Sequence, residues 1–112
     1  MSDTIFAKIA RKEIPADIVA ESARCVAFRD IAPKAPVHIL VVPKQVYATL
    51  NDVNDPTLLG EMLTLARDVA RTEGLADDGY RVVINTNANG GQTVFHLHVH
   101  VLGGRALGWP PG

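Results

Sequence analysis

Helical spacing of apolar residues dominates the middle of the chain. Between Pro56 and Gly74, apolar side chains recur every three or four residues and so share one face of a helix. Asp55 is a favourable N-cap, Pro56 suits the first helical position, and Gly74 provides a stop. A shorter run of the same kind predicts a second helix within residues 4–13, ended by Pro15. The apolar arc of the long helix is wide for so small a protein, so the helix either covers only the chain's own sheet or also packs against a second subunit.

Five segments have the composition and periodicity of strands. The third is almost continuously apolar and β-branched, as expected of a strand covered on both faces. Two prolines between the second and third segments make residues 31–36 a connection rather than a strand. The predicted strands are 17–21, 24–30, 37–42, 80–87 and 95–102.

The last segment alternates imidazole and aliphatic side chains. In an extended strand, residues i, i+2 and i+4 point to one side, so His96, His98 and His100 are expected to share a face while the aliphatic residues pack on the other. A lone histidine on a strand is usually a packed or solvated side chain. Three in register repel one another when protonated, so the pattern indicates a site, either for metal ligation or for acid–base or nucleophilic catalysis.

Composition narrows the class of protein. With 112 residues, 47% of them hydrophobic, the chain is long enough for one domain with its own core, predicted over residues 1–112. A net charge of -1, from 11 basic and 12 acidic residues, disfavours nucleic-acid binding. The lone Cys25 excludes an intramolecular disulfide, and no apolar run suits a signal peptide or a membrane span. We therefore expect a soluble, cytoplasmic protein with no membrane association.

A glycine-containing turn precedes the histidines. Asn89-Gly90-Gly91 permits positive φ and leaves backbone N–H groups uncovered, and Gln92 and Thr93 add an amide and a hydroxyl beside it. An isolated turn of this kind is usually a simple hairpin connection, but this one leads directly into the imidazoles and is predicted to hold an oxyanion or phosphate. His38, within the apolar strand 37–42, is either a packed side chain or a fourth member of the site.

These residues carry a family resemblance. His96-Leu97-His98-Val99-His100-Val101-Leu102 resembles the His-apolar-His-apolar-His-apolar-apolar signature of the histidine triad (HIT) superfamily, and the rest of the chain resembles its Hint branch. The match extends over essentially the whole chain, through Asp3-Thr4-Ile5-Phe6, Arg11-Lys12-Glu13-Ile14-Pro15-Ala16, Arg24-Cys25, Ala35-Pro36-Val37-His38, Gly90-Gly91-Gln92, Gly103-Gly104-Arg105 and Trp109-Pro110-Pro111-Gly112.

The resemblance implies a fold and an activity. The fold is a single α+β HIT domain with a five-stranded antiparallel sheet, one long and one short helix, and dimerisation through a helix and a strand. The activity is hydrolysis of purine nucleoside 5′-phosphoramidates, of the adenosine 5′-monophosphoramidase type, through a nucleotidyl-histidine intermediate. The expected partners are purine nucleoside monophosphates, their phosphoramidates and a second copy of the chain, and no metal or cofactor is needed.

The resemblance also implies roles for individual residues. His98 matches the nucleophile, His96 and His100 match its flanking hydrogen-bonding partners, and His38 matches the fourth site histidine. The nucleotide would be held by Asp30 at the ribose, by Ile5, Phe6, Phe28, Ile31 and Leu40 around the base, and by Asn85, Gly91 and Thr93 at the phosphate, with Gln92 in the same turn and Trp109 reaching the partner subunit's site.

The chemistry of the residues agrees with this implication. A neutral imidazole is nucleophilic near pH 7 and leaves readily once protonated, which divides a phosphoryl transfer into two steps. The departing amine needs a proton, for which His96 and His100 are both candidates. Two positions depart from the Hint pattern: Thr93 stands where serine is expected, and Arg29, where histidine is expected, predicts a more cationic edge of the base pocket.

Other functions remain open at this point. The four histidines suggest a non-catalytic zinc module, although alternate residues on one strand place the outer imidazoles about 13 Å apart at the backbone, too far to converge on one ion. A dinucleoside polyphosphate hydrolase is the alternative within the superfamily. A nucleotide-binding regulatory module that acts through a partner is a third.

Overall fold

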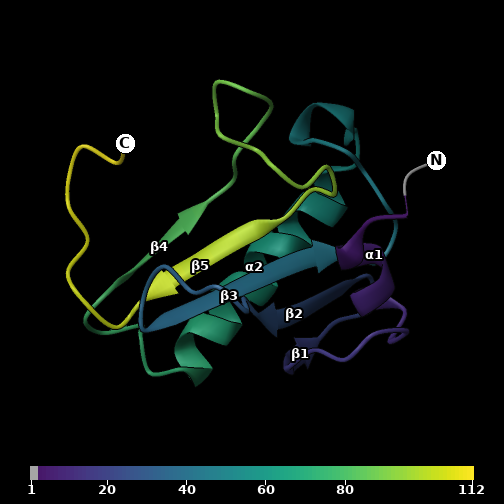
Figure 1. Cartoon of the computed structure of the whole chain (residues 1–112). Helices are drawn as coiled ribbons and strands as arrows, with labels where there is room; N and C mark the ends of the chain where they lie inside the picture. The colour runs from purple at the N-terminus through teal and green to yellow at the C-terminus, as the bar shows by residue number, and fades with distance from the viewer. Residues whose placement is uncertain (1–2) are drawn as a thin grey trace.

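The computed structural model describes residues 3–112 and shows an α+β fold built on one five-stranded antiparallel sheet, as expected (Figure 1). Met1 and Ser2, which the predicted domain includes, lie outside the described residues. None of the helices within residues 3–112 is long and apolar enough to cross a membrane. The strands lie in the order β1-β2-β3-β5-β4. The elements are α1 (Ile5–Ala10), β1 (Ile18–Glu21), β2 (Cys25–Arg29), β3 (Val37–Pro43), the 3-10 helix η1 (Leu50–Asp52), α2 (Pro56–Thr72), β4 (Tyr80–Val83) and β5 (Val99–Gly103).

The sheet is covered on both faces at its centre. The long helix α2 packs across one face, and the short helix α1 lies on the other near the end of β3 (Figure 1). Strand β3 is buried on both sides, as its sequence predicts: Ile39 and Val41 join the cluster under α2, whereas Leu40 and Val42 join the cluster on the α1 side. The α1 side of the sheet is where the site forms.

Helix α2 begins and ends where its sequence predicts. The side chain of Asp55 accepts hydrogen bonds from the backbone N–H groups of Thr57 and Leu58, which have no partner within the helix, and Pro56 occupies the first turn. At the other end, Gly74 adopts a positive φ of 78° that reverses the chain.

Strand β5 is shorter than predicted, and this changes the arrangement of the histidines. It begins at Val99, so His96 and His98 lie in an irregular segment before it. Val99 pairs with Val41 of β3, and continuing this register would bring the chain opposite Pro43, which has no N–H to extend the ladder. The expectation that three imidazoles share one strand face is therefore wrong.

Strand β4 also ends earlier than expected, whereas β3 continues one residue further than predicted, to Pro43. The predicted strand 80–87 stops at Val83, which pairs with His100 near the start of β5. Because β5 begins only one residue before His100, residues 85–87 would lie beyond its start, and the chain leaves the sheet after Val83. The predicted strands 17–21 and 24–30 are shortened by one or two residues to β1 and β2.

Candidate active site

The register of the sheet places three of the expected site residues in one row. Phe28 of β2 pairs with Leu40 of β3, and Leu40 pairs with His100 of β5. Residues that pair directly across strands point to the same face. His38, two residues before Leu40 on β3, points to that face as well. Between this face and α1 lies a cavity of about 290 Å³.

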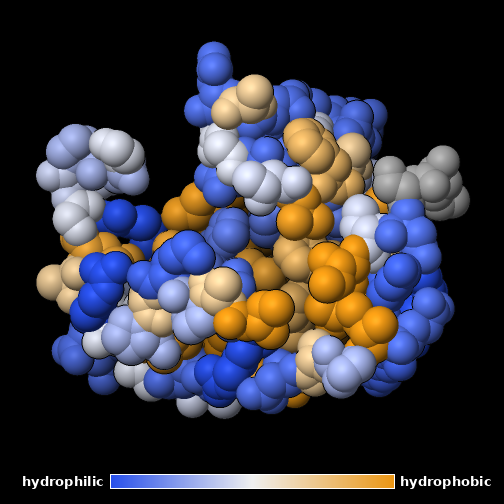
Figure 2. Space-filling model, viewed as in Figure 1, coloured by the Kyte–Doolittle hydropathy of each residue, from blue (hydrophilic) through white to orange (hydrophobic). Residues whose placement is uncertain are grey.

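The cavity is lined mainly by apolar side chains, which gather on the face that carries α1 (Figure 2). It brings together the expected base-slot residues Ile5, Phe6, Phe28, Ile31 and Leu40 with Asp30, Thr93, His98 and His100. Five further apolar residues lining it were not predicted: Ile9, Ile14, Pro15, Ala16 and Val94. The helical spacing of Ile9 from Ile5 and Phe6 was a usable signal for the first of these.

The proton arrangement of His98 follows from its neighbours. Its Nδ1 lies 2.7 Å from the backbone carbonyl oxygen of His96, which can only accept a hydrogen bond. Nδ1 therefore carries the proton, and Nε2 is the unprotonated ring nitrogen at the cavity. The ring of Phe6 packs edge-on against His98, with centroids 5.0 Å apart. Burial lowers the pKa of His98 below its usual 6.5, so the ring is neutral at pH 7.

His38 and His100 form a second chain of hydrogen bonds. The backbone N–H of Lys34 donates to Nδ1 of His38 at 3.0 Å, which places the proton of His38 on Nε2. That proton is donated to Nδ1 of His100 at 2.9 Å, so His100 carries its own proton on Nε2. This buried N–H has no partner among residues 3–112. Burial, together with His98 and His38, lowers the pKa of His100 to about 4.

His96 differs from the other histidines because both of its ring nitrogens form hydrogen bonds with groups outside the cavity. Its Nε2–H donates to the carbonyl oxygen of Pro43 at 2.8 Å, and its Nδ1 lies 2.9 Å from the hydroxyl of Thr4. The residue is fully buried, and burial lowers its pKa. The part of His96 that meets the nucleophile is its backbone carbonyl. Of the two proton donors left open by the sequence, only His100 lies at the cavity.

The turn before the histidines is braced by Gln92. Its buried side-chain N–H groups donate to the carbonyl oxygens of Ala48 and Val94, and its side-chain oxygen accepts from the backbone N–H of Asn87. These contacts occupy the amide, so it holds the loop and does not face the cavity. Asn85 and Gly91 do not line the cavity either, whereas Thr93 does.

The expected cationic edge of the base slot is not present. Arg29 does border the cavity, but its guanidinium is held by Glu73 at 2.8 and 3.0 Å and by Asp17 at 3.2 Å. These two carboxylates more than offset its single positive charge. The sequence did not indicate this arrangement because Glu73 lies 44 residues away, at the end of α2.

Trp109 stands apart from the cavity of its own chain, with 82% of its surface exposed. The C-terminal segment that carries it is held by Arg81 of β4, which donates to the carbonyl oxygen of Gly108 at 2.6 Å and lies 6.0 Å from the centre of the indole ring. Trp109 therefore makes no contribution to the site within one chain.

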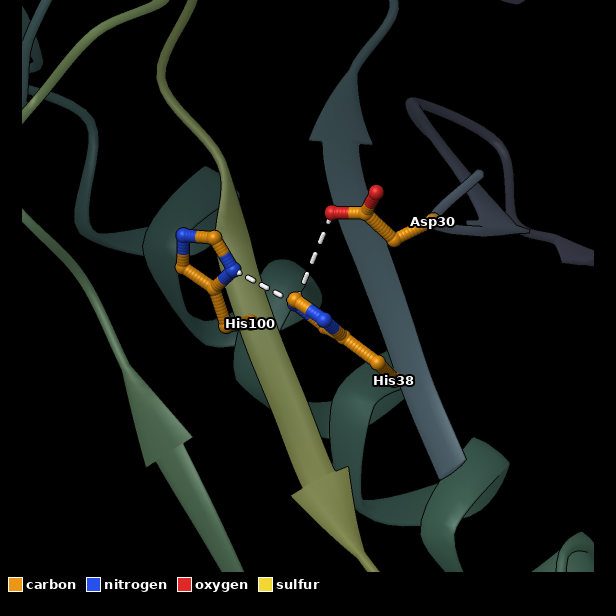
Figure 3. Close-up of side chains that lie close together, drawn as sticks. All are labelled: Asp30, His38 and His100. Atoms are coloured by element: carbon orange, nitrogen blue, oxygen red, sulfur yellow. Dashed lines mark hydrogen bonds and ion pairs between the residues drawn. The ribbon is translucent and has the colours of Figure 1, made fainter. Parts of the chain in front are cut away.

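Asp30, His38 and His100 are grouped closely enough to be tested as metal ligands (Figure 3). One ligand atom from each lies within 4.8 Å of the others. A metal on Nε2 of His38 requires the proton to be on Nδ1, which normally donates to an acceptor in the second shell. Here Nδ1 faces the backbone N–H of Lys34, which is itself a donor. The surroundings therefore suit a chain of hydrogen bonds and do not fit zinc.

Comparisons with known proteins agree with the geometry. The HIT domain family matches residues 11–107. An uncharacterised HIT-like protein of Synechococcus elongatus is 60% identical in an alignment that covers 98% of this chain and 97% of the relative. The purine nucleoside phosphoramidase of Escherichia coli K12 is 53% identical in an alignment that covers 95% of this chain and 91% of the relative.

Solved structures give the same result. The crystal structure of a HIT family hydrolase from Legionella pneumophila is 52% identical, covers 98% of this chain and 100% of its own, and superposes with a TM-score of 0.94. A histidine triad protein from Clostridium difficile is 42% identical, with coverage of 96% of each chain and a TM-score of 0.91. The family signature, the fold and the whole-chain similarity together show that this chain belongs to the HIT domain family.

Proposed function

We propose that this protein is a nucleotide-binding hydrolase that cleaves purine nucleoside 5′-phosphoramidates and releases the nucleoside monophosphate. The observation that carries the proposal is the proton arrangement of His98, whose Nδ1–H is held by the His96 carbonyl so that Nε2 serves as a nucleophile at the cavity. The name of the E. coli relative at 53% identity supports the substrate class.

The cavity offers a separate place for each part of the nucleotide. The base enters the apolar slot beside Phe6 and Phe28, whose rings are 5.5 Å apart. Asp30, at the cavity, accepts from the ribose hydroxyls. The phosphate then lies near His98, with Thr93 on the leaving-group side. Asn85 and Gly91 do not line the cavity, so their proposed contacts with the phosphate require the segment 85–93 to move toward the bound nucleotide.

The reaction proceeds in two displacements. Nε2 of His98 attacks the α-phosphorus, a new P–N bond forms, and the bond to the amine breaks while the amine takes a proton from water at the cavity mouth. Water then attacks the nucleotidyl-histidine, a P–O bond forms, the bond to His98 breaks, and a proton returns to solvent. The His96 carbonyl stabilises the positive charge that develops on the imidazole ring.

His100 acts as a hydrogen-bond donor in this scheme. Its low pKa of about 4 keeps the ring neutral at pH 7, and the N–H of a neutral imidazole is too weak an acid to protonate the amine. Its unpartnered Nε2–H instead donates to a phosphate oxygen, where negative charge increases during the attack. His38 positions His100 by fixing the proton on this nitrogen.

The purified protein is expected to hydrolyse adenosine 5′-phosphoramidate in the presence of a chelator. AMP release is measured by chromatography. A dinucleoside polyphosphate serves as the comparison substrate. Turnover of the phosphoramidate at a kcat/KM at least tenfold above that of the polyphosphate supports the proposal. The reverse preference identifies a dinucleoside polyphosphate hydrolase, and AMP binding without turnover of either identifies a nucleotide-binding regulatory module.

We further propose that two chains form a dimer through α2 and β4. Strand β4 is an edge of the sheet, where Val82 is 39% exposed, and Leu63 of α2 is 49% exposed. The exposed Trp109 would then reach the partner subunit's site. We also assign the protein to the cytoplasm, because its single cysteine is a free, buried thiol.

Deletion of residues 105–112 is expected to alter selectivity among amine leaving groups more than it alters thermal stability. Two hydrogen bonds join the segment to the domain, from Arg81 to the carbonyl of Gly108 and from Arg105 to the carbonyl of Lys34, and residues 105–112 contribute nothing to the buried core. We would measure kcat/KM for a series of phosphoramidates and the unfolding temperature. Trp109→Ala is the matched control and should reproduce the change in selectivity. Equal kinetics for all three proteins across the series would contradict the role of the tail.

A further inference from the structure

Thr4 has contacts that its role as a helix cap does not explain. Its hydroxyl oxygen accepts a hydrogen bond from the backbone N–H of Ala7 at 3.0 Å, which caps α1. The same hydroxyl lies 2.9 Å from Nδ1 of His96, a residue 92 positions away in the sequence. A capping residue needs only the first of these contacts. The second connects the helix that walls the cavity with the segment that carries the nucleophile.

The valence of each atom fixes the protons in this network. The carbonyl oxygen of Pro43 can only accept, so Nε2 of His96 carries the proton and Nδ1 holds a lone pair. The Thr4 hydroxyl must therefore donate to Nδ1, and its oxygen remains free to accept from Ala7. Every polar atom of the His96 ring is satisfied in this arrangement alone, as a fully buried side chain requires.

Thr4 is connected to the nucleophile His98 in two ways, through the backbone of His96 and through helix α1. The backbone carbonyl of His96 holds the Nδ1–H of His98 at 2.7 Å. Phe6, two residues after Thr4, packs its ring against His98 and also against His96, with centroids 6.3 Å apart for the second pair. Movement of α1 would therefore shift both the packing of His98 and the carbonyl that fixes its proton.

We propose that Thr4 is a positioning residue for the nucleophile: its hydroxyl donates to Nδ1 of the neutral His96 ring, whose proton the Pro43 carbonyl fixes on Nε2, and so joins the base-slot helix to the carbonyl that orients His98. The catalytic consequence rests on the proposed function, whereas the effect on the His96 ring does not. Thr4 touches neither the cavity nor His98, so it acts only through His96 and α1.

Three substitutions of Thr4 separate its two contacts. Thr4→Ser retains the cap and the donated hydrogen bond. Thr4→Asp retains a strong cap but presents only acceptors to Nδ1 of His96. Thr4→Val removes both contacts and leaves the shape of the side chain almost unchanged. Comparing Ser with Asp therefore tests the hydrogen bond to His96 at constant capping.

The Thr4→Asp variant should change the pKa of His96, an effect that capping of α1 cannot produce. In the native protein, burial lowers the pKa of His96, the Pro43 carbonyl raises it, and the neighbouring ring of His98 lowers it. Of the side chains that contact the ring, Thr4 and Phe6 carry no charge, so His98 is the ionisable group that faces it. A carboxylate at position 4 favours the imidazolium, so the pKa of His96 should rise in Thr4→Asp and stay unchanged in Thr4→Ser.

The experiment uses the full chain and combines ring NMR of His96 with kinetics on adenosine 5′-phosphoramidate. We expect Thr4→Ser to resemble the native protein within about twofold. We expect Thr4→Asp and Thr4→Val to lower kcat by roughly 10- to 100-fold, with a shifted pH profile in Thr4→Asp at near-native thermal stability.

Two results would overturn the inference. One is the same His96 titration in the Ser and Asp variants, which would show that the group at position 4 does not hydrogen-bond to Nδ1 of the ring. The other is equal kcat and pH profiles in these two variants, which would make Thr4 a helix cap only. If the native protein shows no hydrolysis while the His96 titration still differs between the variants, the proposed function fails and the hydrogen bond from Thr4 to the His96 ring stands.

Discussion

His98→Asn is expected to lower kcat for phosphoramidate hydrolysis by at least about 10³-fold while the fold is retained. The amide N–H of asparagine can occupy the place of Nδ1–H and donate to the carbonyl of His96, so the local structure keeps its hydrogen bond. The variant has no atom equivalent to Nε2, and no nucleotidyl intermediate can form. The loss should therefore appear in the chemical step.

Three measurements make this prediction specific. Single-turnover kinetics should show the loss, and titration with AMP should show affinity within a few-fold of the native protein. Mass spectrometry of a reaction quenched in denaturant should detect a nucleotidyl adduct on the native chain and none on the variant. A His98→Asn protein that keeps more than about a tenth of native activity would show that water attacks the phosphorus directly.

The contrast between His98 and His96 shows what the sequence could predict. The alternating pattern predicted a cluster of imidazoles, because crowded imidazoles have no structural advantage, and the rings of His98 and His38 do lie beside that of His100. It could not show that His96 turns away from the cavity. That outcome depends on two contacts distant in sequence, the Thr4 hydroxyl and the carbonyl of Pro43, and on the inability of proline to extend a strand ladder.

The elements defined by local chemistry were predicted best. Helix α2 carries its N-cap, its first-turn proline and its terminal glycine within the segment itself, so its limits could be placed from sequence. The ion pairing of Arg29 could not be predicted from the sequence, because its partner Glu73 lies at the far end of that helix. The proton positions of His38 and His100 likewise required the structure, since they follow from the backbone N–H of Lys34.

The same buried imidazoles predict how stability depends on pH. The pKa values of His38, His96, His98 and His100 are all lowered in the folded protein, in each case chiefly by burial. In the unfolded chain these groups titrate near 6.5. Below that pH the unfolded chain binds more protons than the folded one, so acid favours unfolding. Their contribution to stability is complete above pH 6.5 and is lost as the pH falls toward the pKa of His100, about 4.

We therefore expect the free energy of unfolding to be constant near pH 7.5 and to decrease between pH 6.5 and about 4.5, by roughly 1.4 kcal/mol per pH unit for each proton bound in excess by the unfolded chain. The carboxylates with lowered pKa values, Glu13, Glu21, Asp55 and Glu61, have ordinary values of 4.5 or below and contribute mainly at lower pH. Urea denaturation at fixed protein concentration measures the effect, and His98→Asn, with one imidazole fewer, should give a shallower slope. An unchanged urea midpoint across this range would mean that the imidazoles titrate normally in the folded protein, and the neutral, nucleophilic His98 would then lose its physical basis.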